Sequence, residues 1–306
     1  MRTVLVTGVN GFVGQHLAKE LIDHGFDVVG IGGAGRPTKD LKNFKILDLT
    51  KPKAVELINF KDIDAVIHLA GLAAVGPSFA NPLLYVKTNM GIEINLFEAA
   101  LKQQAKPKFL IISSGTLYDP SSSLPLKESS AVLANSPYAV SKLGQEQLAA
   151  YYQTRGFECV IARPLNHIGP GQSLGFIVPD LAQQIVQVES QKLDRVLVGN
   201  LRAKRDYTDV RDIVRAYRLL LEKGKPGETY NVCSGDPVSG QEILDMLLKL
   251  SDSKVSTKQD PEKMRPSDTP VVYGSADKLR RDAGWQAEIQ LDQTLEDVLA
   301  DWRAKN

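Results

Sequence analysis

A glycine-rich turn near the N-terminus constrains the fold of this chain more than any other stretch. Residues 2–7 read as a short β-branched strand, and glycines follow at Gly8, Gly11 and Gly14, where a helix with apolar residues at Leu17 and Leu21 begins. A glycine accepts the positive φ of a tight strand-to-helix turn and lets a ligand or a neighbouring backbone approach closely. The helix N-terminus then offers unpaired N–H groups and a partial positive charge to a pyrophosphate. The turn therefore predicts a dinucleotide site, and its alternative interpretation is an ordinary strand-to-helix connection.

The end of the next strand bears on the kind of dinucleotide. Residues 26–31 predict a second strand, which runs into Gly32 and, a few residues later, Arg36. Proteins that hold the adenosine ribose by both hydroxyls commonly carry an acidic residue at about the position of Gly32, and this chain has none there. Arg36 either meets a 2′-phosphate or is a solvated loop residue. The first interpretation favours NADP(H), and NAD(H) stays the alternative.

Further strands and helices alternate along the first half of the chain. Strands are expected at 44–47, 65–71 and 108–113, and helices at 52–58 and 91–104. This alternation predicts an α/β fold of the Rossmann type, a doubly wound parallel sheet with helices on both faces. Ligands of such sheets gather at the carboxyl ends of the strands, so Gly8, Gly71 and Ser114 should border one crevice. His68 lies inside an apolar strand and is interpreted as a core residue.

A tyrosine and a lysine four residues apart open a long predicted helix over 138–155, which Ser136 and Pro137 precede as cap and first-turn residue. Tyr138 and Lys142 would share one helix face. A free tyrosine has a pKa of about 10 and is a poor acid or base at neutral pH. An adjacent ammonium favours the phenolate and should lower that pKa toward the working range. After a cofactor turn and a Ser113-Ser114 strand end, the pair predicts catalysis.

Composition excludes several other classes of protein. The chain has 37 basic and 36 acidic residues among its 306, so no overall field would attract nucleic acid or an anionic membrane. Its two cysteines, Cys159 and Cys233, lie far apart without metal-ligand spacing, which argues against a disulfide framework and a metal site. No apolar run approaches the ~20 residues of a membrane span. A cytoplasmic protein without a membrane or nucleic-acid partner is expected.

The motifs in combination resemble the extended short-chain dehydrogenase/reductase family, in its nucleotide-sugar branch. The matching residues occur in order and at the family spacing: Thr7-Gly8-x-x-Gly11-x-x-Gly14, His68-Leu69-Ala70-Gly71, Asn89, Ser113-Ser114, Tyr138-x-x-x-Lys142 and Arg163-Pro164-x-Asn166. The segments at 163–172, 172–176, 205–212, 230–235 and 265–268 resemble the GDP-mannose group of that family, and within it the reductases of a GDP-linked 6-deoxy-4-keto sugar. The resemblance covers nearly the whole chain.

The resemblance implies a reduction in nucleotide-sugar biosynthesis that gives GDP-D-rhamnose. A hydride from NAD(P)H would reach the C4 ketone of GDP-6-deoxy-4-keto-D-mannose, Tyr138 would supply the proton, Ser114 would hydrogen-bond the same oxygen, and Lys142 would bind the nicotinamide ribose. The expected cofactor contacts are Gly8, Asn10, Gly11, Phe12, Val13, Gly14, Arg36, Asp48, Leu49, Leu69, Ala70, Gly71, Asn89, Ser113, Tyr138, Lys142 and Pro164. The expected substrate contacts are Thr116, Asn166, Phe176, Val178, Arg205 and Arg265, the two arginines gripping the diphosphate.

Other activities on the same scaffold stay open. Related dehydratases carry a threonine at the place of Ser114 and a glutamate at the place of Thr116, so the dehydratase reaction is disfavoured. Asp119 is the carboxylate nearby, and beside Pro120 it reads as a turn residue. Sugar 4-epimerases also carry the serine, and an epimerase that retains its NAD is the main alternative. A non-catalytic nicotinamide sensor would not need the tyrosine–lysine pair. The nucleotide base and the stereochemistry at C4 are not legible in the sequence.

The family resemblance also implies a domain organisation. A Rossmann domain would cover 1–165, with 207–233 returning to it, and 166–206 with 234–306 would form a smaller C-terminal α/β domain that binds the sugar nucleotide. Relatives pair two helices across a two-fold axis into a four-helix bundle. A homodimer through the helices at 91–104 and 138–155 is therefore expected.

Overall fold

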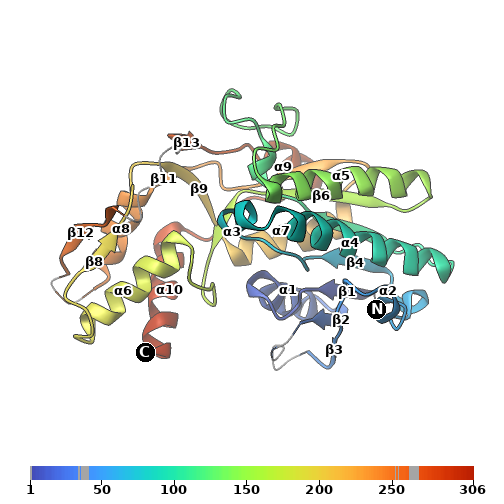
Figure 1. The fold of residues 1–306 in the computed structure, drawn as a ribbon, viewed down its shortest axis with the longest axis horizontal. Helices are drawn as coiled ribbons and strands as arrows, with labels where there is room; N and C mark the ends of the chain where they lie inside the picture. The colour runs from blue at the N-terminus through green and yellow to red at the C-terminus, as the bar shows by residue number, and fades with distance from the viewer. Residues whose placement is uncertain (1, 34, 36–40, 252, 254, 262–268) are drawn as a thin grey trace.

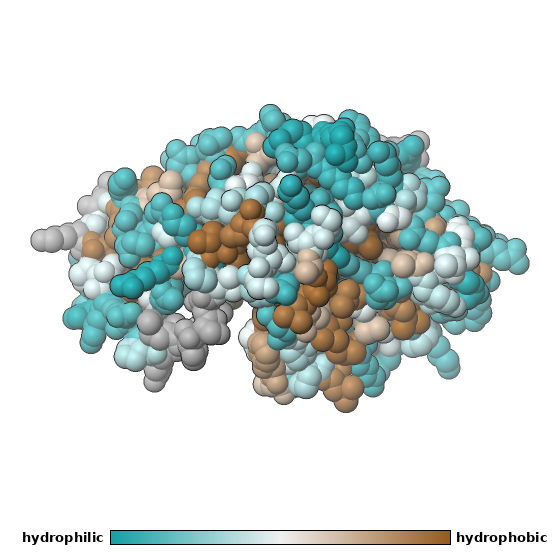
Figure 2. Space-filling view, turned by 90° about the horizontal axis from the view of Figure 1, so that it is seen from above, coloured by the Kyte–Doolittle hydropathy of each residue, from teal (hydrophilic) through white to brown (hydrophobic). Residues whose placement is uncertain are grey.

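A large sheet and a smaller lobe make up the molecule (Figure 1). The computed structural model describes residues 2–33, 35, 41–251, 253, 255–261 and 269–306. The large sheet occupies one side of the view in Figure 1, and the lobe that contains the C-terminus occupies the other. Within the described residues no helix is long and apolar enough to span a membrane. On the face seen in Figure 2, hydrophobic residues gather near the middle and hydrophilic residues cover most of the remainder.

Within the described residues, the large sheet has seven strands in the order β10-β6-β5-β4-β1-β2-β3, and every neighbouring pair is parallel. The strands are β1 (Thr3–Thr7), β2 (Asp27–Gly32), β3 (Asn43–Ile46), β4 (Ala65–His68), β5 (Lys108–Ile112), β6 (Cys159–Pro164) and β10 (Thr229–Val232). The order reverses beside β1, and an open parallel sheet binds ligands at such a point, outside the carboxyl ends of its strands. The predicted Rossmann-type sheet is confirmed.

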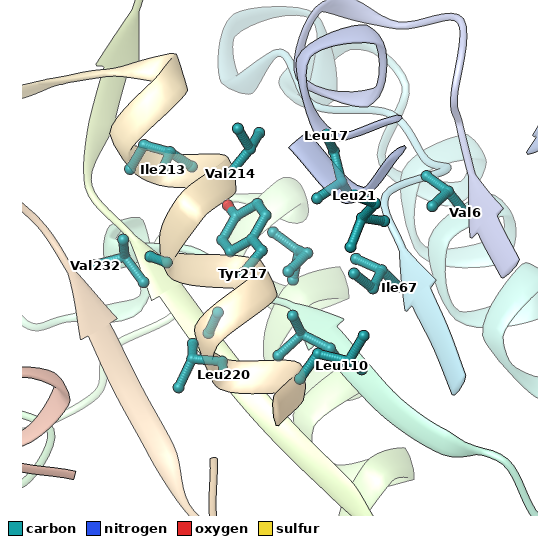
Figure 3. Close-up of a cluster of buried hydrophobic side chains, with 14 of the residues drawn as sticks. Val6, Leu17, Leu21, Ile67, Leu110, Ile213, Val214, Tyr217, Leu220 and Val232 are labelled. Carbon is teal, nitrogen blue, oxygen red and sulfur yellow. The ribbon is translucent and has the colours of Figure 1, made fainter. Parts of the chain in front are cut away.

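Alternating side chains along each strand build a core on both faces of this sheet. In β1, Val4 and Val6 point into one core and Leu5 into the other. The first core lies under α1 (Phe12–Asp23) and α7 (Val210–Lys223), where Tyr217 packs between the two helices and the sheet (Figure 3). The second core lies under α2 (Pro52–Val55), α4 (Pro82–Lys102) and α5 (Pro137–Thr154). Burial of each apolar side chain contributes about 1.5–3 kcal/mol, which fixes the helices on the sheet.

The smaller lobe has its own apolar core, formed mainly by α6 (Ile177–Glu189), α8 (Gly240–Lys249) and α10 (Leu291–Lys305). Its strands form two small sheets. They are β7 (Asn166–Ile168), β9 (Lys204–Asp209), β11 (Pro237–Ser239) and β13 (Val271–Val272) in one, and β8 (Val196–Val198) with β12 (Thr257–Gln259) in the other. The remaining elements are α3 (Val75–Ala80), α9 (Asp277–Ala283) and the short 3₁₀ turns η1 (Phe60–Asp62) and η2 (Gly115–Leu117).

Several segments connect the lobe to the large sheet. Of the stretch 207–233, α7 and β10 lie in the large-sheet layer, whereas residues 207–209 belong to β9 in the lobe. After the lobe, α9 returns to α7, and Trp285 is fully buried in the core under that helix. The indole Nε1 of Trp285 donates to Asp212 O at 2.9 Å. The chain therefore crosses between the two parts more than once, which holds them together beside the strand ends.

Candidate active site

The glycine turn places backbone where side chains would not fit. Gly8 has a φ of +71°, in the left-handed region, and its carbonyl accepts from Gly11 N at 3.0 Å. A Cβ on Gly14 would lie 2.2 Å from Gly8 O, closer than any side chain can come. The first turn of α1 is thereby pressed against the end of β1, and the helix axis points at the carboxyl ends of the strands.

The N-terminus of α1 fits the pyrophosphate of a dinucleotide. Its N-cap residue is Gly11, no side chain caps the first N–H groups, and the first turn holds no acidic residue. These N–H groups are therefore available to an anion. Asn10 turns instead to the end of β2, where its Nδ2 donates to Gly33 O at 3.3 Å. Phe12 stacks on the His167 ring with 6.2 Å between centroids, and Val13 packs against the first core.

Beside the turn lies a groove of about 350 Å³ whose walls are mostly apolar. Of the predicted cofactor residues it is lined by Gly8, Asp48, Leu49 and Ala70. The Asp48 carboxylate accepts from Thr50 Oγ1 at 2.6 Å, and this hydrogen bond holds the pKa of that carboxyl below its usual value. Gly32, singled out above as the place next to the ribose, also lines the groove. Sequence reasoning missed further lining residues, which could have been found because they lie at or just after the ends of β2 and β3, or on α4: Ile31, Gly33, Ile46, Leu47, Thr50 and Ile92.

The loop after β4 is held by hydrogen bonds from its neighbours. Ala70 N donates to Thr7 Oγ1 at 3.1 Å, which fixes this loop next to the end of β1. Leu69 packs partly against the first core. The buried Asn89 side chain accepts from Leu72 N at 2.7 Å and donates to Ser141 Oγ at 2.9 Å. Asn89 was predicted to contact the cofactor, but its side-chain amide hydrogen-bonds to the loop that follows Gly71 and to α5.

Ser114, Tyr138 and Lys142 lie together beyond the end of β5, where η2 and α5 begin. The Tyr138 phenol and the Ser114 side chain lie near enough to interact. Ser114 Oγ also accepts from Thr116 Oγ1 at 2.9 Å, and the predicted substrate residue Thr116 is itself exposed. The Lys142 ammonium donates to Ile112 O at 2.7 Å and lies 6.0 Å from the centroid of the Tyr138 ring.

The titration of Tyr138 differs from the sequence-based expectation. Burial raises the pKa of this phenol above its usual value, and the interaction with the Ser114 side chain opposes the rise only in part. The expected lowering by Lys142 is not seen, because that ammonium is drawn to Ile112 O rather than to the phenol oxygen. Tyr138 is therefore a protonated phenol at neutral pH, the form that donates a proton.

A buried ion pair, which sequence reasoning missed, lies behind these residues. Arg163 Nε donates to Glu146 Oε1 at 2.8 Å and Arg163 Nη2 to Glu146 Oε2 at 2.6 Å, with both side chains more than nine-tenths buried. Ser113 Oγ donates to Glu146 Oε1 at 2.5 Å, so the side chain of this predicted cofactor residue faces α5. The next residue, Pro164, is buried at the end of β6. The pair ties β5, β6 and α5 together under the site.

The predicted substrate residues lie in several places. Asn166 on β7 and Phe176 at the start of α6 are exposed. The Val178 side chain is fully buried in the core of the smaller lobe, so that only its backbone could serve a ligand. Arg205 Nη1 donates to Thr269 O at 2.7 Å and to Lys204 O at 2.8 Å. Arg36 and Arg265 lie outside the described residues.

The described residues include no group of three or more His, Cys, Asp or Glu side chains placed to hold a metal ion. Asp119, interpreted as a turn residue, accepts from Ser121 N at 2.8 Å and Ser121 Oγ at 2.7 Å in the loop after η2. Burial and, to a smaller extent, the charge of Lys142 lower the pKa of His68 to about 3, so this ring is neutral.

Comparison of the sequence with known proteins gives matches over nearly the whole chain. A family model described as GDP-mannose 4,6 dehydratase matches residues 5–298. The GDP-6-deoxy-D-mannose reductase of Pseudomonas aeruginosa is 35% identical, over 99% of this chain and 97% of its own length. The UDP-glucose 4-epimerase of Bacillus subtilis is 30% identical, over 99% of this chain and 97% of its own length.

Comparison of the structure gives the same two kinds of enzyme. The structure of RMD from Pseudomonas aeruginosa complexed with NADPH matches with a TM-score of 0.90 at 33% identity, and the match covers 100% of both chains. The UDP-glucose 4-epimerase of Bifidobacterium longum, in complex with NAD⁺ and UDP, matches with a TM-score of 0.86 at 28% identity, over 99% of this chain and 98% of that one.

Proposed function

Because the chain belongs to the family described as GDP-mannose 4,6 dehydratase, within the extended short-chain dehydrogenases/reductases, we propose that it reduces the C4 ketone of GDP-6-deoxy-4-keto-D-mannose to GDP-D-rhamnose. The chain is an NAD(P)-dependent oxidoreductase of nucleotide sugars, as its relatives are. One observation carries the choice of reduction over epimerisation: the similarity to a GDP-6-deoxy-D-mannose reductase, at 35% identity over 99% of this chain, exceeds the 30% identity to a UDP-glucose 4-epimerase.

In the proposed reaction the chain supplies the proton and holds the cofactor and the sugar in position. Bound NAD(P)H supplies the hydride that reduces C4. Tyr138 donates its hydroxyl proton to the oxygen on C4 as negative charge develops there, and Ser114 hydrogen-bonds the same oxygen. Lys142 holds the nicotinamide ribose and provides positive charge behind the phenol. The turn at Gly8, Gly11 and Gly14 receives the pyrophosphate.

The residue at position 116 argues against water removal as the main reaction. A carboxyl group there would be needed to move protons between C5 and C6 of the sugar, and this chain has Thr116, whose hydroxyl donates to Ser114 Oγ. Epimerisation is the second candidate, because UDP-glucose 4-epimerases are also similar along the whole chain. An epimerase would use Ser114, Tyr138 and Lys142 in the same way but would retain its NAD.

For the cofactor we propose a preference for NADPH. A Cβ on Gly32 would lie 2.2 Å from Asn10 Oδ1, so the place from which an acidic side chain would hold both ribose hydroxyls is filled by Asn10. The relative crystallised with NADPH supports this choice, although the epimerase relative was crystallised with NAD⁺. Arg36 would meet the 2′-phosphate.

For the sugar nucleotide we propose binding between the large sheet and the smaller lobe, with the domain limits expected from the sequence except that residues 207–209 belong to the lobe. Asn166 and Phe176 would contact the sugar, the backbone at Val178 would assist, and Arg205 with Arg265 would hold the diphosphate. Two bonds to carbonyl oxygens already use Nη1 of Arg205, but a guanidinium carries five N–H groups and can also bind phosphate.

We further propose a homodimer and a cytoplasmic location. The two long helices α4 and α5 pack against each other and still expose large apolar side chains. On α4, Leu83 is 75% and Leu84 53% exposed, and on α5, Tyr151 is 50% and Val140 46% exposed. A second copy that packs the same helices into a four-helix bundle would cover them. Free, buried Cys159 and Cys233 fit a reducing compartment.

The test is consumption of reduced nicotinamide by purified protein mixed with GDP-6-deoxy-4-keto-D-mannose, in parallel with NADPH and NADH. We expect stoichiometric loss of absorbance, faster with NADPH. Tyr138→Phe should lower kcat by about 10²- to 10⁴-fold, because the general acid is lost while the ring is kept. Turnover of Tyr138→Phe near the wild-type rate would remove the role of Tyr138. No loss of either cofactor, with epimerisation of a UDP- or GDP-hexose by enzyme-bound NAD, would establish the second candidate.

A further inference from the structure

A glutamate on α4 is buried behind the catalytic lysine. Glu93 is fully buried and lies one helical turn after Asn89. That turn of α4 faces α5, because Asn89 Nδ2 donates to Ser141 Oγ at 2.9 Å and Gln145 Nε2 donates to Asn89 O at 3.3 Å. Glu93 therefore projects toward the stretch of α5 that carries Lys142.

The carboxyl group of Glu93 is poorly satisfied. Neither oxygen has a hydrogen-bond partner among the residues that the structure describes, and the Gln145 side chain interacts with it too loosely to satisfy either one. An unsatisfied polar group of this kind costs about 1–3 kcal/mol, and more if it is charged. Packing alone would be served better by an apolar side chain, so the carboxyl group calls for a functional reason.

Lys142 provides that reason. The partly buried Lys142 ammonium interacts electrostatically with two acidic side chains, Glu93 and Glu146. Glu146 is held in a two-pronged pair by Arg163 and also accepts from Ser113, so its charge is compensated within that network. Burial raises the pKa of Glu93 well above its usual value, and the positive charge of Lys142 opposes that rise, so the charge on Glu93 depends on Lys142.

We propose that Glu93 is a positioning residue of the reaction: as a buried countercharge, it keeps Lys142 protonated and facing the nicotinamide ribose. This proposal rests on the proposed function in one respect, the binding of the nicotinamide ribose by Lys142. Burial lowers the pKa of Lys142 to about 8, and Glu93 and Glu146 act in the opposite direction. Without Glu93, Lys142 would lose its proton at a lower pH, within the neutral range.

Other titratable groups around the pair do not supply this charge. On β6, burial raises the pKa of Cys159 to about 12, and on β4, burial lowers the pKa of His68 to about 3, so both are neutral. On α5, burial raises the pKa of Tyr138, which is also neutral. Arg163 on β6 is paired with Glu146.

The experiment compares Glu93→Gln with wild type. Gln keeps the volume and removes the charge. The first readout is the dissociation constant of NADPH, followed by nicotinamide fluorescence between pH 6 and pH 10, and the second is kcat/KM over the same range. The matched control is Glu98→Gln, which changes the same group on an exposed position of the same helix, where the carboxylate accepts from Tyr152 OH.

We expect Glu93→Gln to move the pH above which NADPH binding and kcat/KM decline downward by about 1 unit or more, with near wild-type values at low pH. The control should superpose on wild type. Glu93→Asp, which restores the charge, should return the profile toward wild type, and it serves as the second variant if the Gln protein does not fold. Superposition of the Glu93→Gln and wild-type profiles would overturn the proposal, since Glu93 would then be neutral.

The binding readout separates this proposal from the proposed function. A wild-type protein that binds NADPH with the expected decline but reduces no sugar ketone would contradict the reductase assignment and still test Glu93. A uniform loss of NADPH affinity in Glu93→Gln at every pH, which Glu93→Asp does not reverse, would show a merely structural role and would also overturn the proposal.

Discussion

At the scale of single residues, the cofactor turn depends on the absence of a side chain at Gly14. Ala at this position would place its Cβ 2.2 Å from Gly8 O, so α1 would have to move away from the strand end. We expect Gly14→Ala to weaken NADPH binding at least about tenfold and to lower the free energy of unfolding by about 1–3 kcal/mol, as overpacking does. Fluorescence titration and urea denaturation measure the two effects.

Gly91→Ala on α4 is the control for that change. Its Cβ would meet no atom within 4 Å, so the substitution should be neutral or should stabilise by about 0.5–1 kcal/mol. If Gly14→Ala bound NADPH as well as Gly91→Ala does, the turn would not be the pyrophosphate site.

The sequence indicates which residues gather at this site but not how they titrate. Ser114, Tyr138 and Lys142 could be predicted to lie together from local patterns. Ser114 follows a strand of a parallel sheet, and the four-residue spacing places Tyr138 and Lys142 on one face of a helix. The sequence predicted a lowered pKa for Tyr138, and this direction was wrong. The burial of Tyr138 and the hydrogen bond from Lys142 to Ile112 O arise only in the packed molecule. The roles of these residues stay predictions.

At the scale of elements, the Glu146–Arg163 pair joins α5 to β6 and makes a stability prediction. Glu146→Gln leaves the guanidinium of Arg163 buried without a countercharge, which should lower the free energy of unfolding by about 3–5 kcal/mol. The control is Asp23→Asn, which breaks the exposed pair with Lys19 on α1 and should cost about 0.5 kcal/mol or less. Urea denaturation compares them, and equal costs would contradict a structural role for the buried pair.

The element boundaries show where local patterns mislead. The sequence predicted a helix over 91–104, but α4 begins at Pro82. Its first turns expose Leu83 and Leu84, so the early part lacks the regular apolar stripe that signals an amphipathic helix. The Glu146–Arg163 pair was missed for a related reason, because the partners lie on different elements and nothing local in the sequence joins them.

At the scale of the whole molecule, the exposed apolar residues of α4 and α5 predict self-association. Wild-type protein should sediment with twice the mass of the chain, and Leu84→Glu should shift it to the monomer by placing a charge in the bundle. Leu57→Glu, at a 66% exposed position outside these helices, should leave the dimer intact. Analytical ultracentrifugation measures the mass of each protein in solution. A wild-type monomer, or a Leu84→Glu dimer as tight as wild type, would contradict the proposed bundle.

Most of the large sheet could be predicted because β1, β2, β4 and β5 are short, mainly apolar strands that run into glycine or serine within three residues. The smaller lobe could not be predicted in detail. Its strands are as short as Val271–Val272, and they pair across long sequence separations, as β9 does with β7 and β13. Its helices are fixed by a core shared among α6, α8 and α10 rather than by their own sequences.

The central claim is that hydride reaches C4 of the sugar while the chain supplies the proton. The most direct measurement is transfer of deuterium from NADPH labelled at either of the two hydrogens on C4 of its nicotinamide ring to GDP-6-deoxy-4-keto-D-mannose, with the product analysed by mass spectrometry and NMR. The account predicts one deuterium at C4 of GDP-D-rhamnose from one of the two labelled cofactors and none from the other. A reduced product without deuterium from either cofactor, or a sugar changed only in configuration while the cofactor keeps its label, would contradict it.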